Sequence, residues 1–393
     1  MKRLTQPPTD PAFVQNPYSF YEEARQHGAM FFWEDYDMVC ALSHATVSMI
    51  LKDRRFGREV PPEMATKHPA HLDPFYRIEA HSMLELEPPR HTRLRGLVLR
   101  AFTTRRIAAL SEGIESLCHE LIDAFPEGEF DLIDALAAPL PVRVICRLLG
   151  VPEDMGPQFL QWSNAMVSMY QARRTHEIEI AAAEAAQEFS DYIRSYVDQR
   201  RSSPGEDLIS ELIAAEEDGE KLSTDELITT CILMLNAGHE ATVHSFGNGV
   251  KALLEHETPH SAYIPDAIAQ TVEEVLRYDP PLHMFTRYAY ETIEVGRHTF
   301  QRGDQVALLL AAANRDPGPW ENPEDFQPQR PIKTNSSFGA GLHFCVGAPL
   351  ARLELSLALP ILFERCPNLQ ITQTPRYANV YHFHGLERLM VTR

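Results

Sequence analysis

The chain has 393 residues, 44% of them hydrophobic, which is enough for a large buried core. Its 36 lysines and arginines are outweighed by 55 aspartates and glutamates, and the net charge of −19 argues against nucleic acid as a partner. The six cysteines lack the spacing of a disulfide framework, and the N-terminal MKRLTQPPTD has no apolar core of a signal peptide or membrane anchor. We therefore predict one cytoplasmic domain over residues 1–393, with reduced thiols and no membrane anchor.

The predicted elements are mostly helical with a smaller strand-rich part, so we predict a mainly α fold. Apolar spacing predicts helices over Tyr18–Gln26 and Ile107–Phe125. Strand-like patches lie within Phe31–Cys40 and Ile293–Leu310, and Arg302-Gly303-Asp304 predicts a turn between two strands of the second patch.

The longest predicted helix begins after Ser223, which forms a capping box with Glu226, and ends near Glu255. Its first half is apolar on nearly every side, so we expect it at the centre of the molecule. The run Asn236-Ala237-Gly238-His239-Glu240-Ala241-Thr242 interrupts this pattern with polar groups and a helix-weakening glycine. A buried carboxylate is costly unless it is paired, and such local conflicts tend to mark functional sites.

The stretch from Phe338 to Gly347 holds three glycines and Cys345, directly before a predicted helix with Pro349 in its first turn. A helix N-terminus favours the thiolate, which is the form that binds metals. Because no second Cys or His lies at ligand spacing, Cys345 makes a poor zinc site but suits a metal that already has its equatorial ligands, as in haem.

The run FGAGLHFCVGAPLARLE resembles the haem-binding signature FxxGxHxCxG of the cytochromes P450, and the resemblance extends through almost the whole chain. It implies the fold of that family, mainly α with a small β part, in which haem b lies between the long central helix and the helix after the cysteine. It implies Cys345 as the axial iron ligand and further haem contacts from Phe338, Gly339, Gly347 and Ala351.

The polar run of the long helix is similar to the family's oxygen-activating motif, (A/G)Gx(D/E)T. The resemblance implies that Ala237 and Gly238 leave room for O2 and that Glu240 is the acid that relays protons, although Glu240 could instead pair with a distant arginine. The family's threonine falls at Ala241, and Thr242 comes one residue late. Three explanations stay open: Thr242 turns inward through a helix bulge, a substrate hydroxyl takes the missing role, or the enzyme releases hydrogen peroxide.

Glu274 and Arg277 resemble the ExxR motif of the family, and their spacing places them on one helical face. Arg330 matches the third member of this buried charge network, whose implied role is to hold the loop that carries Cys345. Removing one partner would leave an uncompensated buried charge.

Four residues match the family positions that bind the haem propionates: His91, Arg95, Arg287 and His343. Two arginines and two histidines around two carboxylates make chemical sense, because charge-assisted hydrogen bonds are strong.

The resemblance also implies substrate contacts, from Leu233, Asn236, Ala237, His283, Phe285, His382 and Phe383. The segments 56–86 and 162–170 are expected to form the lid. Ordinary core or loop packing is the alternative for each residue. Three polar members, Asn236, His283 and His382, favour a substrate with an apolar body and one or two polar groups.

Between Arg90 and Leu110 the chain has six arginines and no acid, in an otherwise acidic protein. The alternative to a docking surface is a helix face of solvated arginines. In the family this helix borders the surface where a small acidic ferredoxin binds, so we expect a ferredoxin to dock near Arg90, Arg93, Arg100 and Arg105.

The resemblance therefore implies a monooxygenase that activates O2 and hydroxylates a small to medium organic substrate, with electrons from a ferredoxin and its reductase. One alternative is a member that performs a different oxidation, such as coupling, desaturation or dehydration, which Ala241 supports. The other is a haem-binding sensor, although nothing in the chain resembles an output domain.

Overall fold

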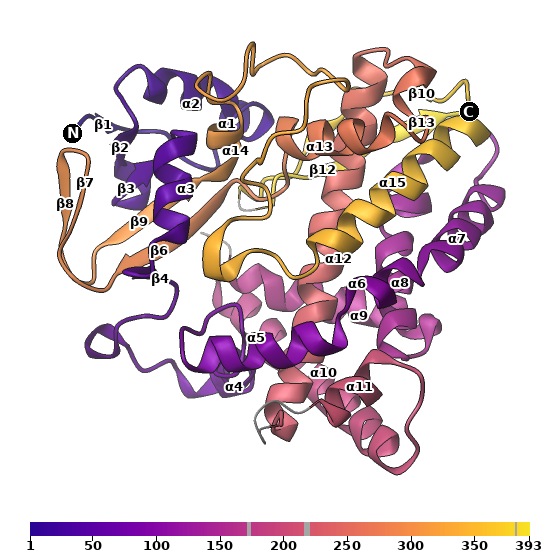
Figure 1. Cartoon of the computed structure of the whole chain (residues 1–393), viewed down its shortest axis with the longest axis horizontal. Coiled ribbons are helices and arrows are strands. Elements are labelled where there is room, and N and C mark those ends of the chain that lie inside the picture. Colours follow the sequence, from indigo (N-terminus) through magenta and orange to yellow (C-terminus); the bar gives the residue numbers. More distant parts are fainter. Residues whose placement is uncertain (171–173, 216–220, 382) are drawn as a thin grey trace.

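The computed structural model describes residues 1–170, 174–215, 221–381 and 383–393. A sheet-rich part that includes the N-terminus lies at one side of the molecule, and helices form most of the rest, with short strands such as β10 and β13 near the C-terminus (Figure 1). Among the described residues, no helix combines the length and the apolar character needed to cross a bilayer. The α-helices of the described residues are α1 (Pro11–Gln15), α2 (Tyr18–Arg25), α3 (His44–Lys52), α4 (Asp73–Glu79), α5 (Arg90–Ala101), α6 (Thr104–Ala108), α7 (Ser111–Asp123), α8 (Pro139–Leu149), α9 (Gly156–Val167), α10 (His176–Ser202), α11 (Leu208–Ala214), α12 (Thr224–Glu255), α13 (Ile268–Tyr278), α14 (Leu310–Asn314) and α15 (Ala348–Arg365).

The strands form one larger sheet and three small ones. The larger sheet has the order β1-β2-β3-β9-β6-β4, with β1–β2 and β3–β9 parallel and the other pairs antiparallel. The small sheets are β10-β13-β5, β11-β12 and β7-β8. The strands are β1 (Arg3–Leu4), β2 (Met30–Trp33), β3 (Met38–Ala41), β4 (Phe56–Gly57), β5 (Phe130–Asp131), β6 (Met284–Ala289), β7 (Ile293–Val295), β8 (His298–Phe300), β9 (Gln305–Leu309), β10 (Gln370–Ile371), β11 (Arg376–Tyr377), β12 (Leu386–Arg388) and β13 (Met390–Thr392).

Helix α12 is the centre of the helical part. It begins after Ser223, and both hydrogen bonds of the predicted capping box with Glu226 are present. It packs against α8, α9, α10, α13 and α15. Its first turns are buried on nearly every side, as the sequence predicted, and Figure 1 shows it passing behind α15 and α5.

Two other predictions from the sequence have clear outcomes. The turn at Arg302-Gly303-Asp304 lies between β8 and β9, where Gly303 has a φ of +93°, a value that favours glycine. The single helix predicted over Ile107–Phe125 is wrong, because the structure divides it into α6 and α7. The Ser111 hydroxyl donates to the carbonyl of Ala108, which satisfies the end of α6 and allows the chain to turn.

Candidate active site

The loop before α15 holds Cys345 in place through glycine and backbone contacts. The amide of Cys345 donates to the carbonyl of Phe338 at 3.0 Å, which closes the loop. Gly339 and Gly341 both have positive φ, and a Cβ on Gly341 would overlap the carbonyl of Leu51 at the end of α3. Glycine therefore lets the loop lie directly against α3.

The environment of Cys345 suits a thiolate ligand. Cys345 is exposed, whereas the other five cysteines are buried. Protein atoms crowded around the accessible sulfur partly desolvate it and raise the pKa of the thiol, and the amides of Gly347 and Ala348 and the guanidinium of Arg95 act against that rise. Donors and positive charge beside an accessible sulfur are the conditions under which cysteine binds a metal.

The remaining residues predicted for the cofactor lie around this loop. Gly347 precedes α15 and accepts the amide of Ala351 at 3.0 Å, so both stand in the first turn. Phe338 is half-buried beneath the guanidinium of Arg352, which lies 4.5 Å from its ring centre. Gly339 approaches the ring of Phe285 on β6.

Glu274 is the centre of a buried ion-pair network. Its carboxylate accepts hydrogen bonds from Arg277 at 2.7 and 2.8 Å, from Nε of Arg330 at 3.2 and 3.3 Å, and from the amide of Gln327 at 2.8 Å. The three charged residues predicted from the sequence are thus brought together, and each is at most 9% exposed.

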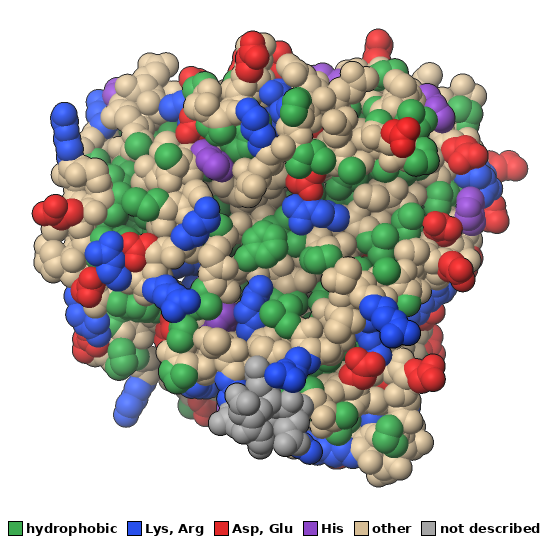
Figure 2. Space-filling view, in the orientation of Figure 1, with side chains coloured by type: hydrophobic (Ala, Val, Ile, Leu, Met, Phe, Trp, Pro, Cys, Tyr) green, Lys and Arg blue, Asp and Glu red, His purple; other side chains and the backbone are tan. Residues whose placement is uncertain are grey.

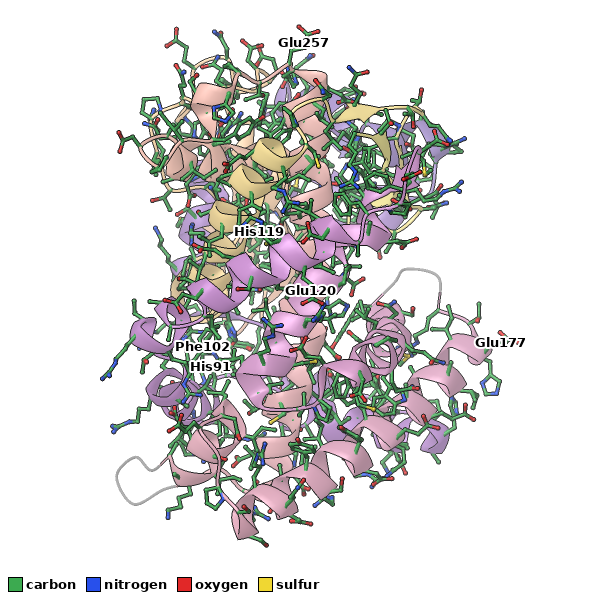
Figure 3. The ribbon with its side chains drawn as sticks, turned by 90° about the vertical axis from the view of Figure 1, so that its right-hand side faces the viewer. His91, Phe102, His119, Glu120, Glu177 and Glu257 are labelled. Carbon is green, nitrogen blue, oxygen red and sulfur yellow. The ribbon has the colours of Figure 1, made fainter. Side chains whose placement is uncertain are left out.

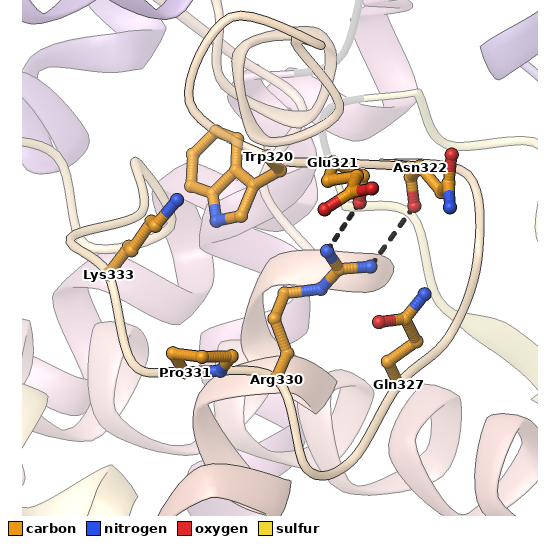
Figure 4. A pocket seen from close by; sticks show the side chains of 7 residues that line it. All are labelled: Trp320, Glu321, Asn322, Gln327, Arg330, Pro331 and Lys333. Atoms are coloured by element: carbon orange, nitrogen blue, oxygen red, sulfur yellow. Dashed lines mark hydrogen bonds between the residues drawn. The ribbon is translucent and has the colours of Figure 1, made fainter.

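The two guanidiniums of this network also bind the chain before the cysteine loop. Arg277 donates to the carbonyls of Asn314 and Pro323. Arg330 donates to those of Glu321 and Asn322 (Figure 4). The cavity of about 370 Å³ in Figure 4 is lined by this loop itself: Trp320, Glu321, Asn322, Gln327, Arg330, Pro331 and Lys333. None of its lining residues belongs to the loop that carries Cys345.

Asn314 connects this network to the cysteine loop. Its side chain donates to the Ser337 hydroxyl at 2.8 Å and accepts the amide of Ser336 at 2.6 Å. The hydroxyl of Ser337 in turn donates to the carbonyl of Leu276 on α13. The loop is therefore attached to the same helix that carries Glu274 and Arg277.

His91 and His343 lie next to each other, with ring centres 4.4 Å apart. His91 on α5 is fully buried, and neither of its ring nitrogens has a partner among the described residues. Figure 3 places it within the body of the protein, whereas Glu177 and Glu257 lie at the edges. Burial, together with the charges of His343 and Arg95, lowers the pKa of His91 to about 4.

The two predicted arginines lie beside this histidine pair. Arg95 donates to the carbonyl of Phe344 in the cysteine loop at 2.7 Å. Arg287 on β6 is 2% exposed, and burial followed by the charge of Arg58 lowers its pKa to about 10. Buried polar groups normally have partners, so the unpaired His91 and the buried Arg287 fit a bound group with carboxylates, as haem has.

Glu87 is a neighbour that the sequence reasoning missed. Its carboxylate lies 2.9 Å from Nε2 of His343 and accepts the amide of Arg58 at 2.7 Å. The signal that could have found it is its position four residues before His91, in a segment that leads into α5.

One face of α12 is open in the middle of the protein. Ala237 is exposed, and Leu233, Ala241 and His244 are half-buried, although most of the helix around them is buried. These positions are four, four and three residues apart, so they share a face. A Cβ on Gly238 would overlap Cδ1 of Ile145, so Gly238 also permits close packing of α8 on α12.

Glu240 has a carboxyl oxygen that, among the described residues, is free to exchange a proton, whereas the Thr242 hydroxyl is already hydrogen-bonded within the helix. Burial raises the pKa of Glu240 to about 7, and its Oε2 has no partner within the described part of the chain, so pairing with a distant arginine is not observed there. Thr242 is buried and its hydroxyl donates to the carbonyl of Gly238 at 3.0 Å. Helix α12 is α-helical throughout, without the bulge that would turn Thr242 inward.

Of the predicted substrate contacts, Asn236 and Phe285 are half-buried, and Asn236 lies 3.6 Å from the sulfur of Met166 on α9. Phe383 pairs with Leu282 in an isolated bridge, whereas His382 lies outside the described residues. His283 does not line the pocket: it is fully buried, and its Nδ1 lies 2.9 Å from the Tyr21 hydroxyl. Strand β6 begins only at Met284, so the strand alternation that would align His283 with Phe285 does not apply.

Several arginines between residues 90 and 110 bind acids or carbonyls in other segments of the protein. Arg93 pairs with Glu226, Arg106 pairs with Glu211, and Arg90 donates to the carbonyl of Ala80. In Figure 2, blue side chains surround green ones on the face that α5 and the cysteine loop occupy. Some of these arginines thus stabilise α5 and α6 against the rest of the protein.

Comparison with known proteins places this chain in a family. Residues 13–260 and 267–376 match the family model "Cytochrome P450". The chain is 37% identical to polyketide biosynthesis cytochrome P450 PksS of Bacillus subtilis (strain 168), with 100% of this chain and 99% of that protein covered. It is 36% identical to cytochrome P450 monooxygenase PikC of Streptomyces venezuelae, with 92% and 87% covered.

The solved structures agree with the sequence relatives. The crystal structure of P450BioI in complex with an acyl carrier protein that carries hexadec-9Z-enoic acid matches with a TM-score of 0.91 at 34% identity, covering 97% of this chain and 99% of that one. The structure of PksS matches with a TM-score of 0.88. These matches confirm the fold and the enzyme class, an oxidoreductase of the monooxygenase type, that the resemblance implied. The chain belongs to the cytochrome P450 family.

Proposed function

We propose that this protein is a haem-thiolate monooxygenase that hydroxylates a small to medium organic substrate with electrons from a ferredoxin. The observation that carries the proposal is the set of groups around Cys345. An exposed cysteine at a helix start lies near a buried His91 without partners among the described residues and a buried Arg287. When bound, haem would supply the activation of O2 and the transfer of oxygen to the substrate.

In this proposal each residue has a simple task. Cys345 binds the iron, and His91, Arg95, Arg287 and His343 hold the two carboxylates of the haem. The open α12 face at Ala237 and Leu233 leaves room for O2 and the substrate.

The proton supply rests on Glu240. A carboxyl group whose pKa lies at about 7 can hold and release a proton near neutral pH, which a carboxyl group in water cannot do efficiently. Because the Thr242 hydroxyl is bound to Gly238, we propose that a substrate hydroxyl takes the role of the missing threonine at Ala241.

The first test is the spectrum of the reduced protein with carbon monoxide. We expect the long-wavelength Soret band of a thiolate complex, and its loss in Cys345→His. Cys366→Ala, at the other end of α15, is the control and should keep the band. A wild-type protein that purifies with haem but lacks this band would contradict the proposal.

Turnover separates hydroxylation from the alternative oxidations. Reduced ferredoxin, its reductase and isotopically labelled O2 should give a product that is heavier by one labelled oxygen. A product formed by coupling, desaturation or dehydration would carry no label and would favour the alternative that Ala241 supports.

The ferredoxin surface is proposed to centre on exposed Leu99 and Phe344, with Arg90, Arg100 and Arg105 around them. Leu99 is 45% exposed and Phe344 is 36% exposed. Arg105→Glu should slow the first electron transfer most strongly at low salt, because exposed charges are screened by ions. Arg297→Glu, in the turn between β7 and β8, is the control, and an equal effect there would contradict a local docking surface.

A further inference from the structure

Two histidines and one glutamate from distant segments meet where α10 begins. His71 lies in the 3-10 helix Ala70–Leu72, within the segment predicted to form part of the lid, and His176 and Glu179 lie in the first turn of α10. Helix α10 packs against this 3-10 helix and against α4. Figure 3 shows Glu177, the neighbour of His176, at the edge of the molecule. We call His71, His176 and Glu179 the histidine cluster.

The spacing of the three side chains suits a metal ion. Nε2 of His71 lies 2.7 Å from Oε2 of Glu179, and Nδ1 of His176 lies 3.9 Å from the same oxygen. One donor atom of each residue lies within 4.8 Å of the other two. In a tetrahedral zinc site the bonds of about 2.0–2.1 Å place neighbouring ligand atoms about 3.3 Å apart. The two measured distances lie on either side of this value, and His176 is 69% exposed, so its ring can turn towards the ion.

The residue types select the class of ion. Imidazole nitrogens suit Zn²⁺, Ni²⁺ and Cu²⁺, whereas Mg²⁺ and Ca²⁺ prefer sets of oxygen ligands. The hydrogen bond to His71, followed by the charge of Arg174, holds the pKa of Glu179 below its usual range, so the carboxylate is charged near neutral pH. Because a carboxylate only accepts, Nε2 of His71 carries the proton of this bond, and a bound ion would displace that proton into solvent.

Arg174 is a cation beside the histidine cluster, but it binds the other carboxylate oxygen. Its Nε donates to Oε1 of Glu179 at 2.9 Å, so Oε2 stays available to an ion. Metal-binding carboxylates commonly accept a hydrogen bond of this kind, which fixes their orientation. Arg174 would therefore hold Glu179 in place, and the net charge of −19 of the whole chain favours cations at its surface.

We propose that the histidine cluster binds one divalent transition-metal ion, such as Zn²⁺, which clamps the segment around His71 to the start of α10. His176 and Glu179 supply two ligands from one helix, and His71 supplies the third across the two segments. The Tyr170 hydroxyl, which donates to Glu79 at the end of α4, already joins the same two regions. The ion would add a further link and oppose opening of the lid. That consequence for the lid rests on the proposed function, whereas the ion site does not.

Calorimetric titration of the purified holoenzyme with zinc chloride, without a polyhistidine tag, tests the site. We expect saturable binding that magnesium chloride does not reproduce. His71→Gln and Glu179→Gln should each weaken it at least about tenfold, because loss of partners outside the ligand set already costs about 10–100-fold. His260→Gln, at an exposed histidine of the 3-10 helix His260–Ala262, is the matched control and should keep the full affinity.

Two results of the titration would overturn the proposal. One is a lack of saturable zinc binding by the wild-type protein, which needs no variant. The other is full affinity in His71→Gln, since the site would then not join the two segments.

Hydrogen–deuterium exchange measures the clamp. At a zinc concentration of about 100 Kd, openings that separate the histidine cluster should become up to about a hundredfold rarer. Amide exchange in residues 66–80 should therefore slow in the wild-type protein and stay unchanged in His71→Gln. Bound zinc without slower exchange would overturn the clamp. Neither measurement needs reduction or turnover, so a thiolate spectrum without zinc binding would overturn only this inference, and zinc binding without that spectrum only the proposed function.

Discussion

Replacing Glu354 with glutamine should stabilise the protein increasingly as the pH rises from 4.5 towards 8. Glu354 lies on α15, the helix that begins next to Cys345, and it is 2% exposed. Its Oε1 has no partner among the described residues, and it faces Cys118 on α7. Burial alone raises the pKa of this carboxyl group from 4.5 to about 8.

The sign follows from proton binding. Below pH 4.5 both the folded and the unfolded chain carry the proton, so Glu354 costs nothing there. As the pH rises to about 8, the unfolded chain releases the proton and the folded chain keeps it, so the free energy of unfolding falls. The difference in pKa corresponds to a loss of about 4–5 kcal/mol at alkaline pH.

Glutamine keeps the shape of the side chain and cannot ionise. Its buried amide still costs about 1–3 kcal/mol if it finds no partner, so we expect a net gain of about 2–3 kcal/mol near pH 8 and a small loss near pH 5. Urea midpoints of the holoenzyme over this pH range measure the effect. Glu364→Gln is the matched control, because Glu364 is exposed on the same helix. A difference between wild type and Glu354→Gln that does not change with pH would refute the reasoning.

Three further substitutions follow from the geometry. Arg330→Met leaves the buried Glu274 with one guanidinium, so the free energy of unfolding in urea should fall by about 3–5 kcal/mol; a loss below about 1 kcal/mol would mean that the pair is dispensable. Gly238→Ala overlaps Ile145 and should cost about 1–3 kcal/mol in thermal stability, whereas the double variant with Ile145→Val should recover it; a lack of recovery would place the strain elsewhere. Ala241→Thr adds a hydroxyl to the open face of α12, and peroxide assays during turnover should show less hydrogen peroxide per O2 consumed. Unchanged release would show that this position does not limit proton delivery.

Local features were predictable because they depend on neighbours along the chain. The capping box of Ser223 and Glu226 and the 3.6-residue period gave the start and end of α12 correctly. The spacing of Glu274 and Arg277 placed them on one helical face, and the family resemblance supplied Arg330. The break between α6 and α7 is the counterexample, because the apolar period continues through it and the side-chain hydrogen bond from Ser111 to Ala108 is not visible in that period.

Other features depend on contacts between distant segments. The spacing of apolar residues in α12 does not indicate that Ile145 of α8 packs against Gly238. This packing role of Gly238 is visible only in the tertiary structure. The direction of His283 was decided by the Tyr21 hydroxyl, far away in the sequence. Nothing local indicates that Arg93 and Arg106 pair with acids more than one hundred residues away.

The sequence by itself determined the family, the candidate cysteine and the central helix, because these rest on residue types at short, fixed spacings. Only the tertiary structure decided which charged groups remain unbalanced. Glu240 on α12 and Glu354 on α15 each have a carboxyl oxygen without a partner among the described residues, and this appears only once the fold has packed other elements around them. The physical reason is that the cost of a buried charge depends on every neighbour within a few ångströms, and the fold selects those neighbours.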